Sequence, residues 1–385
     1  MGTTHTCFRE RSESISKSRR DFLRVAAGLT TGATLSGFGP LRTLAQATGR
    51  KVVVVTFGGG ARDEETFAPD GQRNIPEILT KLIPRATFFT QVVNRGILGH
   101  YVANASIATG AYETFNNFAS VAPQHPTVFE YFRRDLNRPA SDAWVIAPSN
   151  GFNRIGGSSH KSYGPDYGAG VILPKHLLAA AASKNGAEYS HLLQDNYESP
   201  FDTLSLAGSD RHLEQLERIL NLSVTDFTTH ARSLASPDEL SVYIARQLMH
   251  ELAPSLIWIT LHDIDVAHSG AFSLYVEGIR RTDRLCAQIW EMIEAEPEYA
   301  GKTYMFILPD FGRDSDMNAA GNGFQHHRTG DALSRTTWLM ALGPGVREGV
   351  TIDRPAESVD LVPTLGALLG FSARMSEGQR LSEIL

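Results

Sequence analysis

Two carboxylates and two imidazoles fall within seven positions in the middle of the chain, at His262, Asp263, Asp265 and His268. Carboxylate oxygen and imidazole nitrogen are the usual ligands of Zn²⁺ and related divalent ions. An apolar run over residues 256–259 precedes them and is typical of a buried strand. Because ligands in open α/β sheets gather just past the carboxyl ends of strands, the stretch predicts a metal site. The alternative is a polar loop whose acidic residues only cap the next helix.

A second set of candidate ligands lies downstream. Asp310 follows the apolar run 303–308, and His326 and His327 come soon after it in a glycine-bearing loop. A parallel sheet would bring this strand end close to the first group, so we expect these side chains to complete one site. Taken alone, the paired histidines could equally be hydrogen-bonding surface residues.

Strands alternate with helices along the whole chain, and these elements would hold the candidate ligands in place. Strands are expected over residues 51–57, 86–93, 143–147, 256–259, 303–308 and 337–342. This alternation indicates an α/β fold with a mostly parallel central sheet. No internal repeat or low-complexity linker interrupts it, so we expect one domain over residues 48–385, with an irregular insertion near residues 150–170. The net charge of −6 gives no reason to expect nucleic acid as a partner.

Residues 1–47 have the pattern of an export signal. SRRDFL at residues 18–23 resembles the twin-arginine motif, a mild apolar stretch follows, and AQA at residues 45–47 offers a cleavage site. We therefore expect the twin-arginine export machinery as a partner, and a periplasmic or secreted mature chain without a stable membrane span. An uncleaved anchor or an N-terminal amphipathic helix is the alternative, although glycines and a proline interrupt the apolar stretch.

The order of these motifs resembles the alkaline phosphatase superfamily, which includes sulfatases and cofactor-independent phosphoglycerate mutases. VVVVTFGGG at residues 52–60 is similar to its opening strand and metal-binding loop, and SIATG at residues 106–110 to the helix end that follows the nucleophile. VDLVPTL at residues 359–365 is similar to the C-terminal segment of sulfatase-like proteins. The resemblance implies an alkaline-phosphatase-like three-layer sandwich and hydrolysis of small anionic phosphate or sulfate esters.

The resemblance also assigns metal ligands. The first metal would be bound by Asp263 or Asp265, by His268, and by His326 or His327. The usual spacing of the acid and the first histidine lies between the two spacings in this chain, so both acids stay candidates. Asp310 matches the carboxylate of the second metal.

Three positions depart from the family pattern. Gly58 stands where the aspartate of the first strand is expected, His100 stands in place of the nucleophile, and Phe311 replaces the histidine expected after Asp310. The second metal site thus lacks two ligands, so we predict an altered site holding one divalent ion, with Zn²⁺ as the expected metal. The alternative is a non-catalytic metal- or anion-binding descendant of the same fold. A purely structural exported domain would require both clusters to be accidental.

Three further residues are candidates for catalysis or substrate binding. His100 could act as general base, metal ligand or covalent nucleophile, since imidazole can do all three. Arg313 or Arg328 could hold a phosphate or sulfate oxygen through its planar guanidinium. The alternatives are a capped helix start for His100 and surface ion pairs for the two arginines.

Overall fold

The computed structural model describes residues 49–119, 121–194, 206–316 and 322–384. The expected leader, residues 1–47, lies outside these ranges. Within the described ranges, no helix combines the length and the apolar character that crossing a membrane requires.

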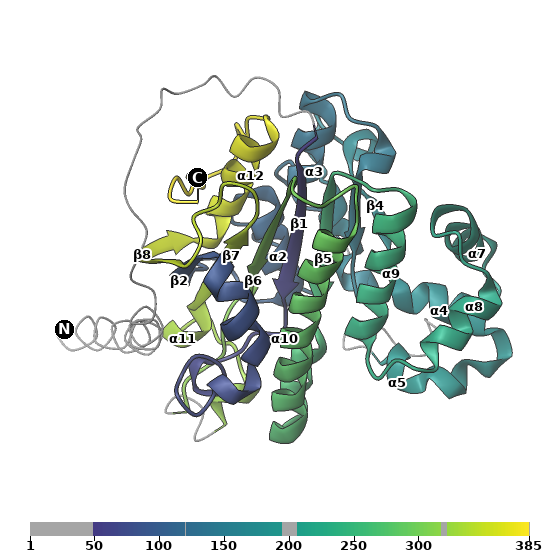
Figure 1. Ribbon diagram of the computed structural model, residues 1–385, viewed down its shortest axis with the longest axis horizontal. Coiled ribbons are helices and arrows are strands. Elements are labelled where there is room, and N and C mark those ends of the chain that lie inside the picture. The colour runs from purple at the N-terminus through teal and green to yellow at the C-terminus, as the bar shows by residue number, and fades with distance from the viewer. Residues whose placement is uncertain (1–48, 120, 195–205, 317–321, 385) are drawn as a thin grey trace.

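An eight-stranded sheet forms the middle layer, in the order β4-β3-β5-β1-β6-β7-β2-β8 (Figure 1). The strands are β1 (Lys51–Phe57), β2 (Thr87–Val93), β3 (Ala143–Ile146), β4 (Gly170–Ile172), β5 (Leu256–Leu261), β6 (Thr303–Leu308), β7 (Thr336–Leu342) and β8 (Val350–Glu357). Strand β7 runs antiparallel to both neighbours, and the other pairings are parallel. The predicted α/β fold with a mostly parallel central sheet is confirmed.

Alternate side chains of a strand point to opposite faces of the sheet. Both faces of this sheet are apolar, and helices cover each of them. Val53 and Val55 belong to one hydrophobic core, and Val52 and Val54 to the other. The first core includes residues of α4 (Pro174–Ala182), α8 (Val224–Ala231), α9 (Pro237–Glu251) and α10 (Phe272–Ala295). The second includes residues of α2 (His100–Thr109), α3 (Val128–Glu130) and α12 (Leu361–Leu369). The chain is thus the three-layer sandwich expected.

The remaining described α-helices are short: α5 (Ser190–Leu193), α7 (Asp210–Glu214) and α11 (Ala332–Arg335). The insertion expected near residues 150–170 contains the 3₁₀ turns Asn150–Gly156 and Pro165–Tyr167 and then enters β4. Its Phe152 ring packs edge-on against the His262 ring, with centroids 5.1 Å apart. The insertion therefore adjoins the predicted site.

Candidate metal centre

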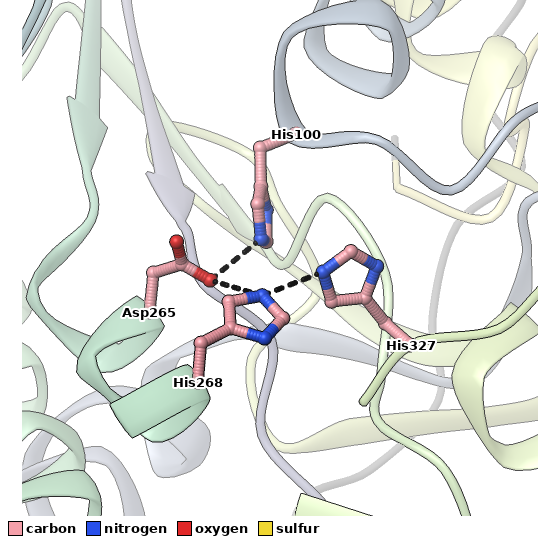
Figure 2. Close-up of side chains that lie close together, drawn as sticks. All are labelled: His100, Asp265, His268 and His327. Atoms are coloured by element: carbon pink, nitrogen blue, oxygen red, sulfur yellow. Dashed lines mark hydrogen bonds and ion pairs between the residues drawn. The ribbon is translucent and has the colours of Figure 1, made fainter. Parts of the chain in front are cut away.

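Four side chains converge past the carboxyl ends of the central strands: His100, Asp265, His268 and His327 (Figure 2). Each offers one ligand atom, and these atoms all lie within 4.8 Å of one another. Asp265 Oδ1 lies 2.9 Å from His100 Nε2 and 3.1 Å from His268 Nε2. His268 Nε2 in turn lies 3.0 Å from His327 Nε2. Members of both predicted clusters thus meet at one point.

The turn that follows β5 presents two of these residues. Strand β5 ends at Leu261, and the 3₁₀ turns Asp263–Ser269 carry Asp265 and His268. The turns end at Gly270, whose φ of 80° lies in the left-handed region that glycine adopts without strain. Both side chains are therefore fixed by a short, tightly wound segment directly after a buried strand.

His100 enters the cluster as the first residue of α2, and the cap of this helix explains its place. Asn117 Oδ1 accepts a 2.9 Å hydrogen bond from the backbone N–H of Tyr101, one of the free donors of the first turn. A Cβ atom at Gly99 would lie 2.6 Å from that same oxygen. Glycine before the helix therefore makes room for the cap, and the helix starts at the predicted residue.

The tautomer of His327 follows from its surroundings. Its Nδ1 lies 2.8 Å from the carbonyl oxygen of Leu98, which can only accept, so Nδ1 carries the proton. Its Nε2 then presents a lone pair to the cluster. Burial, followed by the nearby charge of His100, lowers the pKa of His327 to about 2. The ring is therefore neutral at physiological pH, the state in which imidazole binds a metal.

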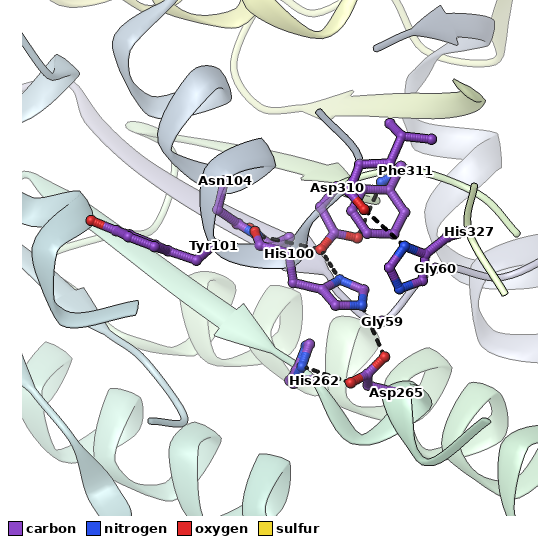
Figure 3. Close-up of polar contacts among 12 residues, drawn as sticks. Gly59, Gly60, His100, Tyr101, Asn104, His262, Asp265, Asp310, Phe311 and His327 are labelled. Atoms are coloured by element: carbon purple, nitrogen blue, oxygen red, sulfur yellow. Dashed lines mark hydrogen bonds and ion pairs between the residues drawn. The ribbon is translucent and has the colours of Figure 1, made fainter. Parts of the chain in front are cut away.

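His100 lies between two carboxylates (Figure 3). Its Nδ1 is 2.6 Å from Asp310 Oδ2, and its Nε2 faces Asp265. The Phe311 ring stacks on the imidazole at a centroid distance of 4.5 Å. Burial opposes a charge on the ring, but Asp265 and then Asp310 outweigh burial and raise the pKa of His100 to about 9. The metal-free protein thus holds an imidazolium here.

Asp265 collects most of the polar contacts of the site. Its Oδ1 accepts from Arg313 Nη2 at 3.0 Å, in addition to facing His100 and His268. Its Oδ2 lies 3.3 Å from His262 Nε2. Burial would raise the pKa of this carboxyl, but His100 and His262 hold it well below its usual range. Asp265 is therefore a carboxylate with one oxygen directed into the cluster.

This donor set fits one divalent ion. A tetrahedral Zn²⁺ with bonds of about 2.0–2.1 Å separates neighbouring ligand atoms by roughly 3.3 Å, close to the 2.9–3.1 Å contacts of the cluster. Metal-bound imidazoles usually direct their second nitrogen to a carboxylate or a carbonyl, as His100 and His327 do with Asp310 and Leu98. The facing Nε2 atoms of His268 and His327 need either a shared proton or a cation between them.

The structure separates the alternatives that the sequence left open. Asp263 lies outside the four-residue cluster, and its Oδ2 accepts a 3.0 Å hydrogen bond from Arg281 Nη1. Asp310 is also outside the cluster, directly behind His100. His326 is not part of the cluster either, whereas the adjacent His327 is. Of each predicted pair, the structure thus brings one member into the site.

The two predicted substrate-binding arginines have other partners. Arg313 is fully buried and donates to the carbonyl oxygens of Gly59, Gly60 and Phe324 as well as to Asp265. This burial contradicts a contact between Arg313 and substrate, because no part of the side chain reaches solvent. The side chain of Arg328 is 53% exposed, and its Nε lies 3.5 Å from a carboxylate oxygen of the buried Asp314.

Sequence reasoning missed the groups that hold the cluster from behind (Figure 3). Asn104 Nδ2 donates to Asp310 Oδ2 at 3.4 Å and its Oδ1 accepts from Thr56 Oγ1 at 2.9 Å. Trp258 Nε1 donates to that same hydroxyl at 3.0 Å. The spacing of Asn104, one helical turn after His100, was a signal that the sequence offered. The partner of His327 is the backbone carbonyl of Leu98, and a backbone carbonyl leaves no signal in the sequence.

No protein-family model and no curated protein matches this sequence. Several solved structures share its fold. The lipoteichoic acid synthase LtaP from Listeria monocytogenes superposes with a TM-score of 0.53 at 10% identity, over 87% of this chain and 75% of that one. The phosphonate monoester hydrolase of Agrobacterium radiobacter gives 0.52 at 12% identity, over 87% and 77%. An alkaline phosphatase superfamily protein from Vibrio parahaemolyticus gives 0.50 at 13% identity, over 96% and 79%.

These likenesses concern the fold, since the identities lie between 10% and 13%. The chain has the alkaline phosphatase superfamily fold in a divergent form, which the order of sequence motifs had predicted. It adds to that fold a compact group of three histidines and one aspartate that could hold a metal ion.

Proposed function

We propose that the protein is a metal-dependent hydrolase of phosphate or sulfate esters that works with a single divalent ion. The observation that carries this proposal is the group of four ligand atoms past the carboxyl ends of the strands. The fold supports it too, because two similar structures are named as an alkaline phosphatase and a phosphonate monoester hydrolase. Zn²⁺ is the metal we propose, because three imidazoles and one carboxylate suit it better than Mg²⁺ or Ca²⁺.

An ion in this cluster would act as a Lewis acid toward the ester and would make water a nucleophile near neutral pH. The side chain of His268 is 42% exposed, so the cluster is reached from its side. Arg328, also exposed, is the remaining candidate for holding the anionic group of a small ester. His100 has both ring nitrogens engaged with carboxylates, so we assign it to metal binding rather than to attack on substrate.

Elemental analysis of the mature protein, purified without chelator, tests the metal site. We compare wild type with His268→Ala and with His326→Ala, a matched control that removes an imidazole just outside the cluster. We expect about one Zn²⁺ per chain in wild type and in the control, and loss in His268→Ala. Two ions per chain in wild type would contradict the one-ion site, and metal-free wild type would refute the proposal.

Hydrolysis of p-nitrophenyl phosphate and p-nitrophenyl sulfate by the same three proteins tests the reaction. We expect turnover of at least one ester that follows the metal content of each protein. The comparison of the two esters also decides between phosphate and sulfate as the transferred group.

One observation favours a second function, binding of a metal without catalysis. Four protein ligands fill a tetrahedral ion, whereas catalytic zinc sites usually keep one position open. If all four residues of the cluster bind at once, the ion would be structural. A protein that holds one ion tightly but hydrolyses neither ester would support this alternative.

Export through the twin-arginine pathway is part of the proposal. It rests on the motif at residues 18–23 and the cleavage site at residues 45–47. Replacing Arg19 and Arg20 by lysine should retain the protein in the cytoplasm, while the wild type should be recovered outside it with an N-terminus near residue 48. Cytoplasmic wild type with residue 1 or 2 at its N-terminus would refute export.

A further inference from the structure

The turn that carries Asp265 and His268 is held by a carboxylate outside the cluster. Asp238 lies in the first turn of α9 and is fully buried. Its two oxygens accept the backbone N–H of His262 at 2.8 and 2.9 Å, and one of them also accepts the N–H of Asp263 at 2.8 Å. Asp238 thus fixes the backbone at the point where β5 leads into the turn.

Asp263 in turn accepts hydrogen bonds from Asp238 and from helix α10. Its Oδ1 accepts from the backbone N–H of Asp238 at 3.4 Å, and its Oδ2 accepts from Arg281 of α10 at 3.0 Å. Arg281 Nε also lies 3.8 Å from Glu239 of α9. The turn is therefore tied to two helices through side chains that do not belong to the metal cluster.

Close backbone packing confines the turn on its other sides. A Cβ atom at Gly59 would lie 2.5 Å from the backbone nitrogen of Asp265, and one at Gly278 of α10 would lie 3.1 Å from Ile264 Cα. This packing blocks movement of the turn toward β1 and α10, but packing contacts do not set the orientation of a peptide group. Hydrogen bonds to N–H groups are directional, so Asp238 sets the orientation of the peptide units from which the turn starts.

We propose that Asp238 and Asp263 form a reciprocal clamp that positions Asp265 and His268 for metal binding, with Asp238 as its main positioning residue. The inference rests on the proposed metal site and assigns Asp263 a role other than ligand. Groups that orient metal ligands from outside typically change metal affinity by about 10–100-fold when they are replaced. Asp265 follows the clamped peptide of Asp263 by two residues, and His268 by five.

The test is the affinity of the full mature chain for Zn²⁺ and the visible spectrum of its Co²⁺ form. We compare wild type, Asp238→Asn and a control, Asp226→Asn. Asp226 also lies in the first turn of a helix, α8, and takes part in its cap, but it holds no part of the metal site. Asparagine keeps the size of the side chain, but its amide nitrogen cannot accept an N–H donor.

We expect Asp238→Asn to bind Zn²⁺ about 10–100-fold more weakly than wild type, with an altered Co²⁺ spectrum. The control should match wild type in both measurements. A role confined to folding would lower the melting temperature of Asp238→Asn and leave the affinity and the spectrum of the folded protein unchanged. That result would overturn the clamp while leaving the metal site in place.

Asp263→Asn provides a second variant should Asp238→Asn fail to fold. The clamp predicts one ion per chain with weakened affinity, because Asp263 is not a ligand. Wild-type affinity in folded Asp263→Asn, or complete loss of the ion, would overturn it. Wild type that binds neither Zn²⁺ nor Co²⁺ would refute the proposed function itself, which separates the two failures.

Discussion

The proton on His100 gives the metal-free protein a predicted dependence of stability on pH. His100 lies 2.9 Å from a carboxylate oxygen of Asp265 and 2.6 Å from one of Asp310. Burial opposes the charge, yet the two carboxylates raise the pKa from 6.5 to about 9. Because the folded state binds this proton more tightly than the unfolded chain, the stabilisation is complete below pH 6.5. It is lost as the pH rises through about 9.

The size of the effect follows from that pKa difference. A difference of about 2.5 units corresponds to roughly 3 kcal/mol of unfolding free energy at about 1.4 kcal/mol per unit. At about 2 °C per kcal/mol for a chain of this length, the melting temperature of metal-free protein should fall by roughly 6 °C from pH 6.5 to 9.5. Calorimetry of chelator-treated wild type and His100→Gln measures it. The variant should be less stable overall, but it should lack this part of the pH dependence.

Metal should remove the dependence, because a metal-bound imidazole carries no proton on its ligand nitrogen. In wild type loaded with Zn²⁺ we therefore expect this part of the pH dependence between pH 6.5 and 9.5 to disappear. Parallel curves in the metal-free proteins would refute the assignment of a raised pKa to His100. A pH dependence of the same size in loaded wild type would show that His100 is not a ligand.

Three more outcomes are expected. Gly58→Asp should lower the unfolding free energy by about 3 kcal/mol or more, since a Cβ there would lie 2.1 Å from the carbonyl oxygen of Leu261. It should not add a second ion. Urea unfolding checks the first outcome and elemental analysis the second. Arg313→Met should destabilise by about 3–5 kcal/mol, since it removes a buried cation from Asp265 and the donor to the carbonyl oxygens of Gly60 and Phe324, and urea unfolding measures this. Chelation should lower the unfolding free energy of wild type by about 3 kcal/mol when free metal had been at 100 times its dissociation constant. Calorimetry at several metal concentrations checks the dependence.

Much of the fold was predictable because its strands are buried on both faces. Strands β1 and β6 were predicted with their observed bounds, since a parallel strand covered by helices is a continuous apolar run. The antiparallel direction of β7 was not predictable, because direction depends on the connection and not on the strand's own residues. The segments Ile78–Leu82 and Tyr131–Asp135 are π-helical, and the periodicity of a sequence does not distinguish a single π-helical turn from an α-helical one.

The site was predictable as a set of residues but not as a set of contacts. Motif order named His268 and left two acids and two histidines as alternatives. The structure brings Asp265 rather than Asp263 into the cluster, and Arg281 and Asp238 contact Asp263 from helices α10 and α9. These partners are distant in sequence and have no fixed spacing to the motif. Arg313 was misjudged for a similar reason, since its carbonyl acceptors are backbone atoms with no residue signature.

The contacts of Asp310 support the proposal that this site holds one ion. Its Oδ2 faces His100 and accepts from Asn104, and its Oδ1 accepts from the backbone N–H of Phe311 at 3.1 Å. In the family pattern this carboxylate would bind the second metal, but here it pairs with the imidazole of His100. The Phe311 ring stacks on that imidazole, and a side chain at Gly58 would collide with the neighbouring strand. Restoring one ligand would therefore not restore a second ion, because the rest of its place is filled by protein.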